Sequence, residues 1–235
     1  MSDFLKLRNR ICVLAILGFC FSSSAGAFWL LNFQTAPTLE PGKLAFIGGT
    51  GGQFTVVGNP GRDNFTPFLA HFGIRLGLMD RLDVGYRLTT VALPYSSVGP
   101  SLGGEIDFKY FLCSANDPWQ FSLIGGLAYA YVDVLNQSKS AWSPGVDILL
   151  THPLGSALDL SLNGRYVYTG IPTASGGEGL NNLTASGGSV GLNIKLGPTS
   201  AIKPEIGMFN FNGLIGGNIT DGLGAQYGVV FSSKL

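Results

Sequence analysis

The sequence predicts an all-β fold, a closed antiparallel transmembrane β-barrel of about ten strands. The first observation is a hydrophobic pattern of period two that runs through most of the chain and is clearest in Thr66–Leu93. The second is composition: 46% of the residues are hydrophobic and only 12% are charged, about half of the roughly 25% usual in soluble domains. The third is that no apolar run of about 20 residues follows the N-terminal region, which argues against membrane-spanning helices.

The clearest pattern lies in Thr66–Leu93. Apolar side chains occupy alternate positions, and the positions between them carry His, Arg, Asp and Gly. The triplet Met79-Asp80-Arg81 interrupts the pattern, which then resumes. Two long runs of period two around a short break predict a β-hairpin with one apolar and one polar face.

The N-terminal region reads as a signal for export. Basic residues precede the apolar run Ile11–Phe21, and a stretch of small residues ends in Ala25-Gly26-Ala27. This order predicts a secretory signal peptide over residues 1–27, cut after Ala27. Residues 28–42, with two prolines, are then expected to form a periplasmic arm, and residues 43–235 the barrel domain.

The expected mature chain excludes several kinds of partner and site. Losing Lys6, Arg8, Arg10 and Asp3 leaves 11 basic and 13 acidic residues, so no basic patch predicts binding to nucleic acid. Cys113 is the one cysteine left, which excludes an internal disulfide and a cysteine-rich metal site. We expect no cofactor and no bound metal.

Ten strands are expected in chain order, each from its own alternation. The first is rich in glycine, the second and third form the hairpin, and polar or glycine-rich segments separate the others. Short connections alternate with mostly longer ones, of which Gly170–Ser186 is the longest. The expected strands are Lys43–Val57, the two halves of Thr66–Leu93, Ser101–Leu112, Trp119–Val132, Trp142–Thr151, Leu158–Thr169, Gly187–Leu196, Ala201–Asn210 and Gly222–Phe231.

Every charge within these strands falls on the face opposite the large apolar residues. Seven of these charges are basic, counting Lys43, and six are acidic, a near balance that predicts internal salt bridges. We therefore expect a polar network lining the lumen. Its members are His71, Arg75, Asp83, Arg87, Glu105, Asp107, Lys109, Asp147, Asp159, Arg165, Lys195, Lys203 and Glu205.

Alternation alone leaves two architectures open: a soluble lipocalin-like barrel with an apolar cavity, or a membrane barrel with a polar lumen. The alternating connection lengths and strands of about ten residues favour the membrane barrel, and so does the about 2–4 kcal/mol cost of a lipid-facing Lys or Arg at the midplane. Aromatic residues near the strand ends predict a girdle at each interface. These are Phe108, Tyr110, Trp119, Phe121, Tyr129, Tyr131, Trp142, Tyr166, Tyr168 and Phe231.

Two segments carry a resemblance to small outer-membrane β-barrel proteins of Gram-negative bacteria. One is the turn Gly77–Gly85, and the other is the closing segment Asp221–Phe231, which is similar to the C-terminal assembly signal of that class. Ser232–Leu235 depart from the pattern, because an aromatic residue usually ends the chain. The resemblance implies an outer-membrane location, contact with lipid and lipopolysaccharide, and recognition by the barrel-assembly machinery.

The fold leaves the function open. The leading expectation is a porin-like narrow channel, or a structural or surface barrel that binds through Gly170–Ser186, in either case not an enzyme. The alternatives are an outer-membrane enzyme acting on lipid or peptide, and a secreted ligand-binding barrel. The two histidines, His71 and His152, form no recognisable pairing with a serine, and the carboxylates Asp83, Glu105 and Asp107 are interleaved with basic residues.

Overall fold

The computed structural model describes residues 30–57, 63–65, 68–92, 101–114, 116–134, 137–171, 181–215 and 218–235. The predicted signal peptide lies outside these residues. Within them, no helix has the length and apolar character needed to cross a membrane. The strands are β1 (Leu44–Val57), β2 (Asp63–Phe65), β3 (Phe68–Met79), β4 (Leu82–Ala92), β5 (Ser101–Phe111), β6 (Gln120–Val134), β7 (Gln137–Pro153), β8 (Leu158–Ile171), β9 (Asn181–Lys195), β10 (Ser200–Ile215) and β11 (Asn218–Lys234).

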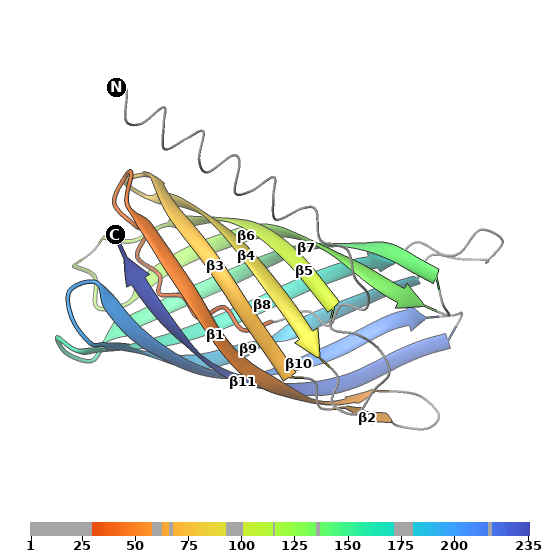
Figure 1. Ribbon diagram of the computed structural model, residues 1–235. Coiled ribbons are helices and arrows are strands. Elements are labelled where there is room, and N and C mark those ends of the chain that lie inside the picture. The colour runs from red at the N-terminus through yellow and green to blue at the C-terminus, as the bar shows by residue number, and fades with distance from the viewer. Residues whose placement is uncertain are drawn as a thin grey trace, which may run out of the picture.

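Ten of the described strands close into an antiparallel barrel, as predicted (Figure 1). Each long strand pairs with the next long strand along the chain, and β11 returns to pair with β1, for example at Gly51 and Gly228. Among the described residues, the short strand β2 pairs with the end of β1 alone. Closure pairs the backbone of the strands at the seam, which is what a sheet needs in order to cross a bilayer.

The two faces of the sheet point as the membrane barrel requires. Large apolar side chains on the outside are exposed, such as Phe72 at 53%, Val146 at 58% and Ile206 at 61%. Charged side chains that alternate with them along the strands are buried inside, such as Arg75 at 6%. The lipocalin-like alternative needs the opposite orientation and is therefore wrong.

The connections differ in length from the sequence-based expectation. The expected loop Phe211–Asp221 is mostly strand, since β10 runs to Ile215 and β11 begins at Asn218. Likewise β7 begins at Gln137 rather than Trp142, and β9 at Asn181 rather than Gly187. These extensions mix polar and apolar residues without a sustained alternation. Beyond the bilayer both faces of a hairpin meet water, so backbone pairing continues without an apolar face to mark it.

The final strand also ends later than predicted. β11 continues past Phe231 to Lys234, and Ser232 is buried at 8% and pairs with Ala201 of β10. The alternation persists here, because Phe231 points outward and Ser232 inward. The residues after Phe231 therefore complete the wall at the end where the short turns lie.

Candidate functional site

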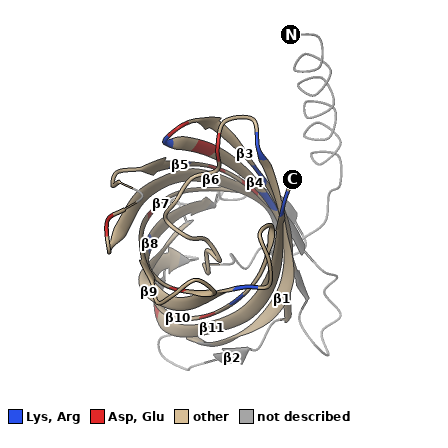
Figure 2. Cartoon of the chain, turned by 90° about the vertical axis from the view of Figure 1, so that its left-hand side faces the viewer, with Lys and Arg blue, Asp and Glu red and all other residues tan. Residues whose placement is uncertain are grey.

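The candidate site is the lumen of the barrel, seen along its axis in Figure 2. Nearly all of the sequence-predicted network residues are buried or half-buried on the inner face of the wall. The exception is Lys195, which is exposed near the short-turn end. Lys43, predicted to be the first residue of a strand, instead precedes β1 on the exposed rim. Their part in solute passage stays a prediction, but the structure shows which of them meet.

Three neighbouring strands build the first ionic group. Arg75 of β3 forms ion pairs with Asp83 of β4 and Asp107 of β5. Lys109 Nζ lies 3.4 Å from the other oxygen of Asp83. Gly85 lies directly between these side chains, and a Cβ there would come within 2.4 Å of the Arg75 guanidinium. The glycine therefore leaves the space through which Arg75 reaches Asp107.

A second ionic group spans the lumen. Glu105 of β5 pairs with Arg87 of β4, and its other oxygen lies 2.7 Å from Arg165 of β8. Arg165 Nε lies 3.3 Å from Asp147 of β7. Strands β5 and β8 are not neighbours in the sheet, so this group crosses the interior rather than following the wall.

A third ionic group lies nearer the short turns. Asp159 of β8 accepts hydrogen bonds from Lys195 at 2.8 Å and from Asn193 at 2.8 Å. Lys203 of β10 is half-buried, and no ion pair joins it to another described residue. His71 is buried, with its ring 5.4 Å from that of Phe33.

The main departure from the expected domain organisation concerns residues 30–42, which we call the strap. They were expected to form a periplasmic arm, yet the strap runs inside the barrel, as Figures 1 and 2 show. Leu30, Leu31, Asn32, Phe33 and Ala36 are each at most 4% exposed. The sequence shows no period that predicts this placement, because the strap lies outside the sheet and is neither helix nor strand.

The strap enters at the short-turn end through a tight turn. Gly42 has a φ of +80°, which a glycine adopts without steric cost. Its N–H donates to the carbonyl oxygen of Gly77 at 2.8 Å. A Cβ on Gly77 would lie 2.1 Å from the carbonyl oxygen of Glu40. Glycine at 77 therefore permits the strap to pass in direct contact with β3.

Side chains of the wall satisfy the backbone of the strap. Its N–H groups donate to Gln226, Glu205, Thr151 and Asp83. Its carbonyl groups accept from Arg87, Lys109 and Ser122. A buried backbone group without a partner is costly, so these contacts are what makes burial of an irregular segment tolerable.

Apolar residues of the strap form a small core within the lumen. Leu30, Leu31 and Phe33 are each at most 1% exposed. They belong to one apolar cluster with Leu69, Val167, Ala185, Phe209 and Val230 of the wall. This cluster places apolar side chains of the strap and of the wall together inside the barrel, beside the ion pairs.

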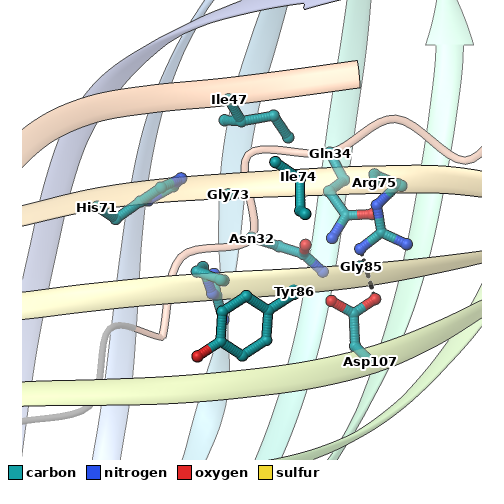
Figure 3. Close-up of a pocket in the computed structure, with 11 residues that line it drawn as sticks. Asn32, Gln34, Ile47, His71, Gly73, Ile74, Arg75, Gly85, Tyr86 and Asp107 are labelled. Carbon is teal, nitrogen blue, oxygen red and sulfur yellow. Dashed lines mark hydrogen bonds and ion pairs between the residues drawn. The ribbon is translucent and has the colours of Figure 1, made fainter. Parts of the chain in front are cut away.

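A polar hollow remains between the strap and the wall formed by β3 and β4. Figure 3 shows Asn32 and Gln34 of the strap facing this wall, and the ion pair between Arg75 and Asp107. The side-chain oxygen of Gln34 and the Nε of Arg75 are buried there without a hydrogen-bond partner among the described residues. Hollows of this polarity hold ordered water in folded proteins.

The structure also places the residues considered for catalysis. His152 stacks on Trp119 at 4.6 Å, and its Nδ1 lies 2.6 Å from the carbonyl oxygen of Pro118, at the rim with the short turns. The carboxylates Asp83, Glu105 and Asp107 are all held in ion pairs. Among the described residues no cluster of His, Cys, Asp and Glu has the arrangement of a metal site.

The girdle aromatics lie on the outer surface. Phe108, Tyr110, Trp119, Trp142, Tyr166, Tyr168 and Phe231 are between 39% and 49% exposed, while Phe121 and Tyr129 are half-buried. Tyr129 and Trp142 meet edge to face at 4.5 Å across β6 and β7. The side chain of Tyr131 lies outside the described part of the structure. An outward position at strand ends is where aromatic belts sit in membrane barrels.

Sequence reasoning missed the uncharged residues that hold the strap. Gln226 accepts from Leu30 and Leu31 and donates to Gln53, while Ser122 and Thr151 bind the strap near Ala36. All four residues lie on the polar face of their strands, and this position is the sequence feature that could have identified them as lumen residues. The predicted network contains only His71 and charged side chains, so it does not include these four residues.

Comparisons with known proteins identify the fold. No protein-family model matches the chain, and no curated protein matches it significantly in sequence. The outer membrane protease OmpT from Escherichia coli matches with a TM-score of 0.51 and 9% identity, covering 87% of this chain and 100% of that one. The COG4313 outer membrane channel from Pseudomonas putida F1 matches with a TM-score of 0.55 and 14% identity, over the same shares. At such identities the likeness is one of fold.

A closed antiparallel barrel with an apolar outside and a polar inside defines a transmembrane β-barrel. The similar solved structures are outer-membrane proteins. The chain therefore has the fold of outer-membrane β-barrel proteins, which confirms the predicted fold class. Its particular activity does not follow from the fold, since one of the two similar barrels is a protease and the other a channel.

Proposed function

We propose that the protein is a narrow channel for small polar solutes, closed in this structure by its strap. The observation that carries this proposal is that a segment outside the sheet fills the lumen. A barrel of this size can fill its interior with wall side chains alone. This one instead leaves room for the strap, for example at Gly77, and surrounds it with polar and charged groups. With the strap withdrawn, those groups line a polar pore.

The proposal includes no catalytic step. The carboxylates Asp83, Glu105 and Asp107 are engaged by basic side chains. A general acid or base must be able to exchange a proton with a bound substrate. The protease among the similar structures has 9% identity to this chain, so it lends support to the fold and to nothing further.

Single-channel recording of the full chain in planar bilayers tests the proposal. Wild-type protein should stay mostly closed. The double variant Glu205→Gln, Lys109→Met should open more often, because it removes two charged groups that hold the strap. The variant Arg81→Met removes an exposed cation at the turn after β3, outside the lumen, and it should behave as wild type.

The second candidate is a structural or surface barrel without conduction. It is favoured by the ion pairs that cross the lumen and by the apolar cluster around the strap. Absence of openings in wild type and in the double variant, with both proteins folded and inserted, would contradict the channel and favour this candidate.

A further inference from the structure

We propose that the lumen is a binding site for an extended, uncharged peptide, and that the strap is its resident ligand. From Leu30 to Leu39 the strap carries no charged side chain. The wall holds it mainly through its main chain, with contacts from β4, β5, β6, β7, β10 and β11. The expected effect of the peptide on channel opening rests on the proposed function, whereas peptide binding itself does not depend on it.

Two successive N–H groups of the strap donate to one carboxylate where the backbone adopts a positive φ. The N–H groups of Asn32 and Phe33 both donate to Glu205, at 3.1 and 2.5 Å. Phe33 has a φ of +54°, the one positive value among non-glycine residues that the structure describes. Successive N–H groups that converge at such a turn form an anion-binding nest. Glu205 is therefore placed to recognise a main-chain conformation.

The strap's carbonyl groups meet cations. Lys109 Nζ donates to the carbonyl oxygens of Thr35 at 3.0 Å and Pro37 at 2.9 Å. Arg87 donates to that of Leu31 at 2.8 Å. Since these contacts are made to the backbone, they suit any extended uncharged segment of the same conformation.

Side chains of the strap supply sequence preference. Leu30, Leu31 and Phe33 enter the apolar cluster of the wall, next to Leu69 and Phe209. Asn32, which lies between Leu31 and Phe33 in the sequence, makes a polar contact instead: its side-chain amide donates a hydrogen bond to Asp147 at 3.0 Å. A peptide ligand should therefore have apolar side chains at the positions of Leu30, Leu31 and Phe33 and an amide side chain at the position of Asn32. A charged side chain at these buried positions should prevent binding.

The connection between strap and wall is what allows a test. Glu40, Pro41, Gly42 and Lys43 are exposed at the short-turn end. A protease recognition sequence inserted between Pro41 and Gly42 can be cut after the full chain has folded. The strap then becomes a separate peptide in an intact barrel. The probe is a synthetic peptide of residues 30–40 that carries a fluorophore at its carboxyl end, which corresponds to the exposed rim.

Cut barrel in detergent micelles should release its strap on dilution and then bind the probe saturably, as read by fluorescence anisotropy. A scrambled probe should not bind. Lys109→Met and Glu205→Gln should each weaken binding roughly ten- to a hundredfold, as expected for hydrogen bonds to charged groups. Arg81→Met, which removes an exposed cation at the turn after β3, should bind the probe as the parent does. If the cut strap stays bound through dilution, it should leave faster from the first two variants than from Arg81→Met.

Several outcomes would overturn the inference in barrels whose gel mobility still shifts on boiling. These are no saturable binding to an emptied barrel, equal binding of the scrambled probe, or equal affinities and release rates in all three variants. Conductance separates this inference from the proposed function. A cut barrel that binds the probe without ever conducting contradicts only the channel. One that conducts and is not blocked by the probe contradicts the peptide site.

Discussion

Removing the cation at the centre of the first ionic group should strongly destabilise the barrel. Arg75 is 6% exposed and pairs with both Asp83 and Asp107, which are 0% and 4% exposed. Arg75→Met keeps much of the side-chain volume but leaves buried carboxylates behind. Lys109 still faces Asp83 at 3.4 Å, so the uncompensated charge falls mainly on Asp107. Breaking a buried pair from one side costs about 3–5 kcal/mol, and we expect a loss in that range.

The assay is urea unfolding of the protein in lipid vesicles, followed by the gel mobility of unboiled samples. Arg81→Met is the matched control, because Arg81 is an exposed cation at the turn after β3; its free energy of unfolding should change little. Adding Asp107→Asn to Arg75→Met should recover part of the loss, since it removes the orphaned charge. A loss below about 1 kcal/mol for Arg75→Met would refute the reasoning, because exposed ion pairs contribute no more than that.

Three further predictions concern the strap, the seam and the membrane. Gly77→Ala should push the strap's turn aside and raise protease cleavage near Glu40, because the new Cβ would lie 2.1 Å from that residue's carbonyl oxygen; Gly164→Ala, with open space around its Cβ, should leave cleavage unchanged. Tyr227→Ala should lower the free energy of unfolding by about 1 kcal/mol, because this ring covers Gly52 across the β1–β11 seam; an equal loss for Tyr166→Ala would argue against a special role of the seam. Finally, the full chain should need detergent for extraction and should migrate differently before and after boiling, and a soluble protein without that shift would contradict a membrane barrel.

Local patterns along the chain were enough to predict the barrel and the orientation of its wall. Alternation of period two is a local property, so the hairpin Thr66–Leu93 could be read without knowledge of any partner strand. The same alternation placed Arg75, Asp107 and Arg165 on the polar face. Ends of strands were predicted less well. Where β10 and β11 continue beyond the bilayer, water on both sides removes the apolar face that marked them elsewhere.

The segment that occupies the lumen could not be predicted from local patterns and is known from the long-range contacts of the fold. The strap has no period, and its partners Glu205, Lys109 and Gln226 are separated from it by about 70 to nearly 200 positions in the chain. Which charge meets which also depended on closure, because Arg165 and Glu105 belong to strands that are not neighbours in the sheet. A local pattern reports which way a side chain points. The contact it makes across a closed barrel is set by ring size and register, which come from all of the strands together.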